Sequence, residues 1–110
     1  MNIKNFNVVE GTTHYINIDC VHDDSNEKFY LEGYEVVFWL RTKNNDVIKK
    51  EVTTIDNAIS VKLEPEETRG KDYLTYECRI VAINGDIFHV ATGKIKIVKP
   101  KIPVDLLVIE

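Results

Sequence analysis

The sequence predicts an all-β protein, an antiparallel β-sandwich of about seven strands. Apolar and polar residues alternate with a period of two through most of the 110-residue chain, which is the pattern of strands buried on one side. The alternating segments follow one another at short spacing with polar turns between them, as expected of an all-β sandwich. The period of a helix is nearly absent, so we expect no more than one helical turn.

The first half of the chain contains four expected strands, at residues 3–9, 15–20, 34–42 and 47–53. Alternation is clearest in the second, where apolar residues share one face and polar residues share the other: Ile16, Ile18 and Cys20 against Asn17 and Asp19. A polar loop follows this strand at 22–28. A turn at 43–46 joins the third strand to the fourth.

The segment that follows contains a fifth strand and a connection. Ile59, Val61 and Leu63 alternate with polar residues and predict a strand over 59–63. Residues 64–70 then combine proline, glutamates and glycine. This composition predicts a connection that crosses between the sheets, with one helical turn.

The last two strands are expected to form a hairpin. Asn84-Gly85 favours a two-residue type I′ turn, because both central residues of that turn have positive φ. Such a turn places Ile83 opposite Asp86 and fixes all other pairs. The core face would carry the pairs Leu74/Ile95, Tyr76/Gly93, Cys78/Ala91, Ile80/His89 and Ala82/Ile87. The opposite face would carry Tyr73/Lys96, Thr75/Lys94, Glu77/Thr92, Arg79/Val90 and Val81/Phe88.

Length and charge narrow the possible functions. We assign residues 1–99 to one domain and 100–110 to an extended arm. The net charge of −4 argues against a nucleic-acid partner, since phosphate binding needs a surplus of Lys and Arg. The start of the chain lacks the pattern of a secretory signal. No apolar run approaches the roughly 20 residues that cross a bilayer. We therefore expect synthesis in the cytoplasm and no membrane association.

Two cysteines and a tyrosine suggest an immunoglobulin-like sandwich. Cys20 and Cys78 would face inward from opposite sheets, and Tyr76 precedes the second cysteine by two residues, as in a tyrosine corner. A structural disulfide and two buried thiols are the alternatives for the cysteines. Cytoplasmic synthesis favours thiols.

The tryptophan between the cysteines has the wrong phase for an antibody domain. Trp39 shares its strand face with Glu35 and Arg41, so an inward Trp39 would bring two charges into the core. The other face is wholly apolar and includes Phe38. We therefore expect Phe38 in the core and Trp39 on the outside.

Two segments carry a family-like pattern, LEGYEVVFWLRTK (31–43) and VKLEPEETRGKDYLTYECRIVAINGDIFHVATGKIKIV (61–98). The pattern comprises Leu31, Gly33, Val36, Phe38, Leu40, Leu63, Pro65, Thr68, Tyr73, Tyr76, Gly93, Ile95 and Ile97. In these residues the chain resembles the small β-sandwich domains of tailed-bacteriophage structural proteins, with the nearest likeness to the N-terminal domain of the upper baseplate protein family. The resemblance implies a structural protein of a virion or prophage-derived particle. The long fibre or coiled-coil region of that family has no counterpart in this sequence.

Residues that could perform chemistry are few. Cys20, His22, Asp23, Asp24 and Glu27 lie close together, but their spacing matches neither a zinc site nor a calcium loop, so we expect no metal and no cofactor. A nucleophilic Cys78 would need exposure and an adjacent base, and the strand pattern places it on the core face. His89 is expected at the core margin. We therefore expect no enzyme activity.

Apolar residues expected outside the core predict an interaction surface on the outer face of the sheet that contains the hairpin. The residues are Val37, Trp39, Val81, Phe88 and Val90. In an immunoglobulin-like strand order they would form one exposed patch, which commonly marks a binding surface. The alternative is that a loop or the N-terminal segment covers the patch.

The arm adds a second expected contact region. After Pro100 it carries six large aliphatic residues: Ile102, Val104, Leu106, Leu107, Val108 and Ile109. Each would contribute about 1.5–3 kcal/mol when buried, either on its own domain or on a neighbouring subunit. These two surfaces predict assembly with copies of the chain, as a homo-oligomer, or with other proteins. With the resemblance to phage structural proteins, which implies the setting, the expected function is that of a non-enzymatic virion protein of a tail, baseplate or neck that binds itself or other virion proteins. The alternative is an adhesin-like or carbohydrate-binding sandwich that uses the loops at 22–28 and 43–46.

Overall fold

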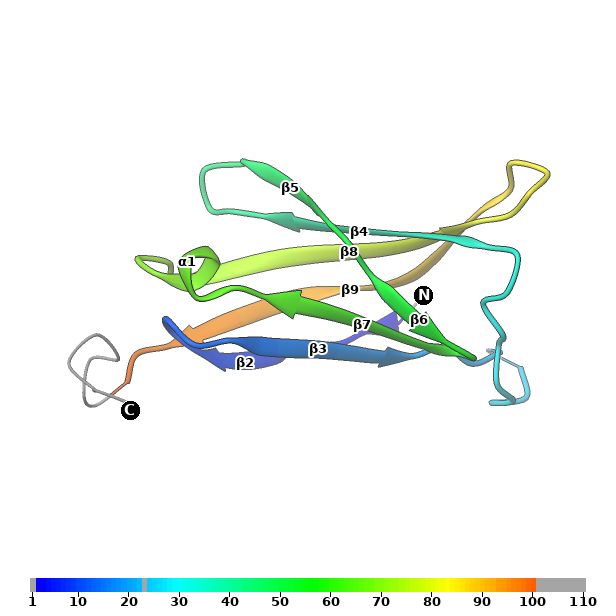
Figure 1. The fold of residues 1–110 in the computed structure, drawn as a ribbon, viewed down its shortest axis with the longest axis horizontal. Coiled ribbons are helices and arrows are strands. Elements are labelled where there is room, and N and C mark those ends of the chain that lie inside the picture. Colours follow the sequence, from blue (N-terminus) through cyan, green and yellow to red (C-terminus); the bar gives the residue numbers. More distant parts are fainter. Residues whose placement is uncertain (1, 23, 101–110) are drawn as a thin grey trace.

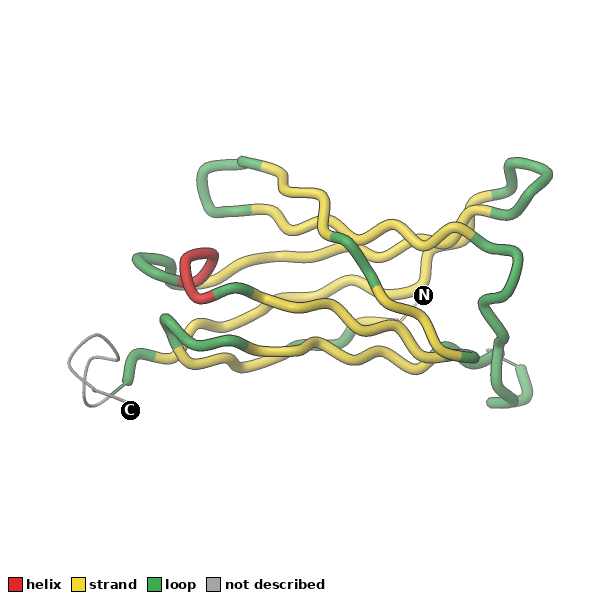
Figure 2. Tube along the Cα trace, in the orientation of Figure 1, coloured by secondary structure: helices red, strands yellow, loops and turns green. Residues whose placement is uncertain are grey.

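The computed structural model describes residues 2–22 and 24–100, and it shows a mostly β protein built from two sheets (Figure 1). Strands make up more than half of the described residues, and one short helix interrupts them (Figure 2). The all-β expectation is therefore confirmed. Nine strands are described where about seven were expected.

The larger sheet has six strands in the order β1-β9-β8-β4-β5, with β2 pairing to the same edge of β9 as β1. β1 and β2 run parallel to β9, and the other pairs are antiparallel. The strands are β1 (Asn2–Ile3), β2 (Phe6–Val9), β4 (Glu35–Arg41), β5 (Val47–Lys50), β8 (Tyr73–Val81) and β9 (Ile87–Val98).

The smaller sheet is antiparallel, with the order β3-β7-β6. Its strands are β3 (His14–Asp19), β6 (Thr53–Ile55) and β7 (Ala58–Leu63), and the helix α1 (Pro65–Thr68) follows β7. Two expected strands are each divided in the structure. The first breaks at Lys4 and Asn5, between β1 and β2. The fourth crosses from the larger sheet as β5 to the smaller sheet as β6.

The core lies between the two sheets and contains Phe38. This side chain is fully buried, and its ring stacks on that of Tyr76 with centroids 5.3 Å apart and an interplanar angle of 6°. The alternating apolar residues of β3 and β7 pack against it from the smaller sheet. Phe38 therefore occupies the core, as the phase of its strand predicts.

The hairpin register is right for six pairs and wrong for the outer three. Pairs from Tyr73↔Lys96 to Cys78↔Ala91 match the expected alignment. Beyond them the register shifts by one residue, so that Arg79 pairs with His89, Ile80 with Phe88 and Val81 with Ile87. The shift leaves Val90 as the extra residue of a β-bulge in β9.

The cause of the shift is the turn, which is a three-residue loop and not the expected type I′ turn. Ala82 N–H donates to the Asp86 carbonyl, and Gly85 alone in the loop has positive φ, at 92°. Asn84 keeps an ordinary backbone conformation, and its Oδ1 accepts a hydrogen bond from Asp86 N–H at 3.0 Å. A three-residue loop with glycine in the left-handed region is the next commonest hairpin connection.

The break between β1 and β2 brings Lys4 against the hairpin. The Tyr76 hydroxyl donates to the Lys4 carbonyl at 2.6 Å, and Lys94 N–H donates to Asn5 Oδ1 at 2.9 Å. Gly93 makes this approach possible, because a Cβ at that position would lie 2.0 Å from the Lys4 oxygen and 3.0 Å from the Tyr76 ring. The expected pairing of Tyr76 with Gly93 is thus observed, with the backbone of Lys4 as a third member.

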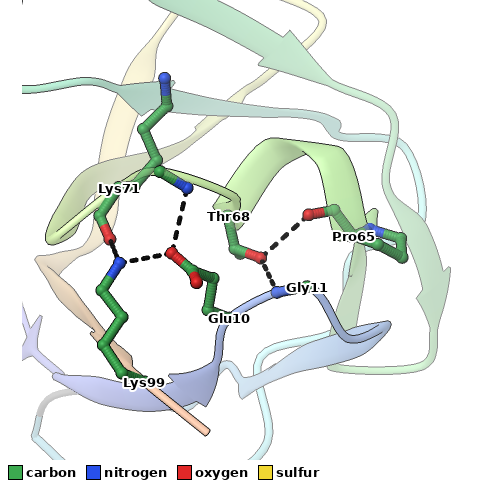
Figure 3. A network of polar contacts seen from close by, with 7 residues as sticks. Glu10, Gly11, Pro65, Thr68, Lys71 and Lys99 are labelled. Atoms are coloured by element: carbon green, nitrogen blue, oxygen red, sulfur yellow. Dashed lines mark hydrogen bonds and ion pairs between the residues drawn. The ribbon is translucent and has the colours of Figure 1, made fainter. Parts of the chain in front are cut away.

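A polar network joins the end of β2 to α1 and to the end of β9 (Figure 3). Glu10 Oε2 accepts hydrogen bonds from Gly70 N–H, at 3.0 Å, and from Lys99 Nζ. Lys99 Nζ also donates to the Lys71 carbonyl at 3.0 Å. The buried Thr68 hydroxyl bridges Gly11 N–H and the Pro65 carbonyl. These contacts hold three segments together at one end of the sandwich.

Candidate functional site

The candidate site is the outer face of the larger sheet, the face turned away from the smaller sheet. Both the smaller sheet and α1 lie on the other side (Figure 1). Strand pairing places Trp39 beside Glu77 on one side and Lys49 on the other. Around Trp39 the face is hollowed by about 530 Å³, and the hollow is lined by Trp39, Arg41, Val47, Thr75, Tyr76, Glu77, Arg79 and Thr92.

Charged side chains surround the tryptophan in this hollow. The Arg79 guanidinium lies 5.6 Å from the centroid of the Trp39 ring, within the range of a cation–π contact. Arg79 Nε also forms an ion pair with Glu77. Trp39 is partly buried by these neighbours and still lines the open hollow. The site thus combines an aromatic surface with charged hydrogen-bond donors.

His89 belongs to this group and does not sit at the core margin, as the sequence suggested. Because the bulge shifts the register, it pairs with Arg79 on the outer face, and its Nε2 lies 3.6 Å from Glu77 Oε1. Its Nδ1 is shielded from solvent and has no hydrogen-bond partner among the described residues. This position could not be predicted from the sequence, because the bulge has no signature in the residue pattern.

The expected apolar patch is only partly present. Val37 lies on the outer face, but only 8% of its surface is exposed. Arg79 is its pairing partner on β8, so the two side chains are neighbours on this face. Val81 is on the outer face and partly exposed, next to Glu35 and Ile87.

Two residues expected in the patch do not belong to it. Phe88 pairs with Ile80 and therefore shares the inner face, where it remains 48% exposed near the end of the hairpin. Val90 is the bulged residue and packs against the core. Both assignments were wrong for the same reason, namely the single-residue shift of the register. The aliphatic residues from Ile102 to Ile109 lie outside the described residues.

The residues that the sequence analysis missed are the charged neighbours of Trp39. Arg41, Lys49 and Arg79 were not assigned a role, although strand alternation alone places Arg41 on the face of Trp39. Their position beside the only tryptophan was the available signal.

The two cysteines are free thiols inside the core. Burial raises the pKa of the Cys78 thiol to about 12 and that of Cys20 to about 11, and the proximity of each to another ionisable group adds to the effect. Thiolates at these positions are scarce at neutral pH, which disfavours nucleophilic chemistry. Among residues 2–22 and 24–100, no three His, Cys, Asp or Glu side chains lie close enough together to hold a metal ion.

No helix within the described part of the chain is long and apolar enough to cross a membrane. No protein-family model and no curated protein matches this sequence, so the functional argument rests on the geometry of the site.

Proposed function

We propose that this chain is a non-enzymatic assembly domain that works by protein–protein contact through the outer face of its larger sheet. The observation that carries the proposal is the hollow around Trp39. Trp and Arg are the residue types most enriched among residues that dominate binding energies, and here Trp39 is accompanied by Arg41 and Arg79 on one open face. The core between the two sheets is filled by other apolar residues, among them Phe38, so Trp39 is not part of it.

We further propose that the fold is immunoglobulin-like. In that fold one sheet contains strands G, F and C, with C′ added in variable-type domains, and the other sheet contains B, E and D. The order β9-β8-β4-β5 and the order β3-β7-β6 follow the same sequence of neighbours. The chain departs from antibody domains at three points. Its cysteines are free, and Phe38 takes the core position while Trp39 lies outside. The Tyr76 hydroxyl bonds to Lys4, far away in sequence.

A virion or prophage-derived particle is the proposed setting, as a component of a tail, baseplate or neck. The support is the resemblance to phage β-sandwich domains. In the structure, most of the residues that carry this resemblance are core residues, including Leu31, Leu40 and Ile95. They specify the fold. The setting in a virion therefore stands on the resemblance alone.

The proposal extends to the aliphatic arm at 101–110, whose side chains would be buried on a neighbouring subunit. Light scattering of the full chain and of a chain ending at Pro100 tests it. Loss of the arm should lower the mass of the assembly or reduce solubility. A protein with unchanged mass and solubility would contradict the role of the arm, and a Trp39→Ser variant that assembles like the wild type would contradict the role of the outer face.

A further inference from the structure

Charge is distributed unevenly over the molecule, and the outer face is its basic part. Strand pairing places five cationic residues on that face, Arg41, Lys49, Arg79, Lys94 and Lys96, against two carboxylates, Glu35 and Glu77. The face therefore has a formal charge of +3, although the whole chain has a charge of −4. An anionic partner would be attracted to this face.

The acidic part of the molecule is one end of the sandwich, which we call the acidic end. It comprises the exposed carboxylates of Asp19, Asp24, Glu27, Glu32 and Asp56, and Lys28 is the single cation among them. Backbone hydrogen bonds gather these segments, since Leu31 N–H donates to the Asp56 carbonyl and Phe29 N–H to the Cys20 carbonyl. Counted over these described residues, the formal charge of the acidic end is −4, opposite in sign to that of the outer face.

An exposed tyrosine lies within the acidic end. Tyr30 is 60% exposed, although both of its neighbours point inward. Leu31 is 4% exposed, and the Phe29 ring packs against His22 and Tyr34 with centroids 5.0 Å and 5.2 Å apart. Tyr30 is therefore held outward on an anchored loop, with Glu27 and Glu32 on either side in sequence. An exposed aromatic residue on an ordered loop is a typical anchor of a protein interface.

From this complementarity we propose that the outer face of one copy binds residues 24–32 of a second copy. Tyr30 enters the hollow around Trp39, and the carboxylates of Glu27 and Glu32 pair with Arg41, which lines the hollow, and with Lys49, the strand partner of Trp39 on β5. The inference rests on the proposed function and names the partner of its site. A nucleic acid is disfavoured as the occupant, because the acidic end and the carboxylates on the face itself would repel phosphates.

The two surfaces are different parts of the same chain, so the contact is heterologous. Each bound copy still presents a free outer face or a free acidic end. Contacts of this kind continue until a ring closes or a filament forms. The arrangement thus predicts a series of oligomers that grows with concentration and not a closed two-fold dimer.

Two neutralising double variants test the proposal by light scattering of the full chain. Arg41→Gln with Lys49→Gln removes charge from the outer face, and Glu27→Gln with Glu32→Gln removes it from the acidic end. The wild type should grow in mass with concentration at low salt and return to a monomer at about 1 M salt, where the screening length is about 3 Å. Each double variant alone should remain monomeric at concentrations at which the wild type assembles.

The mixture of the two variants is the decisive measurement. Each supplies the intact surface that the other lacks, so an equimolar mixture should form a one-to-one dimer that grows no further. The matched control is Glu51→Gln with Glu66→Gln, two exposed carboxylates away from the loop at 24–32, which should assemble like the wild type. Circular dichroism of each variant shows that the fold is retained.

The outcomes separate this inference from the proposed function. Assembly that persists in both double variants, or a mixture that stays monomeric, overturns the pairing of the outer face with the acidic end but leaves assembly through other contacts intact. A wild-type chain that is monomeric at every concentration also overturns it. Binding of a DNA duplex by the wild type that is lost in Arg41→Gln with Lys49→Gln would replace the second copy with a nucleic acid.

Discussion

At the scale of single residues, the contact between Gly93, Tyr76 and Lys4 determines how the N-terminal segment docks on the hairpin. The Lys4 carbonyl occupies the space that a side chain at residue 93 would need, and the Tyr76 hydroxyl supplies its hydrogen bond. The pairing of tyrosine with glycine could be predicted from the hairpin register. The third partner could not, because Lys4 is 72 residues from Tyr76 and no sequence pattern links the two.

A double-mutant cycle tests this contact. Gly93→Ala should lower the free energy of unfolding by about 1–3 kcal/mol, because the new Cβ displaces the backbone of Lys4. Tyr76→Phe should cost about 1–3 kcal/mol, because it leaves the Lys4 carbonyl without its donor. The combined variant should lose less free energy of unfolding than the sum of the two single losses, since either change alone already displaces Lys4. Urea unfolding measures all three, and strictly additive losses would contradict the shared contact.

The cysteines provide a second test at this scale. With pKa values raised to about 12 for Cys78 and about 11 for Cys20, both thiols should react slowly with a thiol-specific reagent at pH 8 in the native protein. In denaturant both should react at the rate of a small free thiol. Rapid modification of the native chain would show that the cysteines are accessible and that the core is packed differently.

At the scale of elements, alternation predicted the position of every long strand, and local backbone chemistry decided where the prediction failed. The Asn84-Gly85 turn is an example. Its sequence is compatible with two loop lengths, and the hydrogen bond from Asp86 N–H to the Asn84 side chain favours the longer loop. The bulge at Val90 then restores the register deeper in the sheet. The bulge has no signature in the residue pattern, so the outer pairs could not be predicted.

Two alanine substitutions distinguish the loop types. Gly85→Ala should lower the free energy of unfolding by about 1–2 kcal/mol, because Gly85 has positive φ. Asn84→Ala should cost less than about 1 kcal/mol, because only an exposed hydrogen bond is lost. In a type I′ turn both positions would have positive φ, so equal losses in chemical denaturation would indicate that the hairpin has the shorter loop.

The network at Glu10 links three elements and makes a pH-dependent contribution to the free energy of unfolding. Hydrogen bonds from the Lys99 ammonium and the Gly70 N–H hold the pKa of the Glu10 carboxyl below its usual value of 4.5. A carboxyl with a lowered pKa in the folded state stabilises the protein above its unfolded pKa, and the contribution is lost as the pH falls through the folded value. The exposed site is screened by salt, so the effect should also weaken at high ionic strength.

Glu10→Gln tests this linkage. The variant should unfold at a lower urea concentration than the wild type at pH 7. The difference should shrink below pH 4.5 and disappear once the wild-type carboxyl is protonated in the folded protein. A difference that is the same at neutral and acidic pH would mean that the side chain acts through packing and not through its charge.

At the scale of the whole molecule, the candidate site could be predicted in part. The phase of one strand places Trp39 outside and Phe38 inside, and both positions are observed. The composition of the surrounding face was predicted as apolar and is largely charged, because the shifted register takes Phe88 and Val90 away from it. The opposite charges of the outer face and the acidic end depend on how loops are folded together, and no local pattern contains that information.

The central claim is that the outer face is the contact surface of an assembly, and the emission of its tryptophan tests it most directly. Trp39 is the only tryptophan of the chain, so quenching by a small neutral quencher reports on this site alone. At low salt, access of the quencher to Trp39 should fall as the protein concentration and the mass rise together. Mass that rises while access stays constant would show that the chain assembles through another surface, and this account of the site would be wrong.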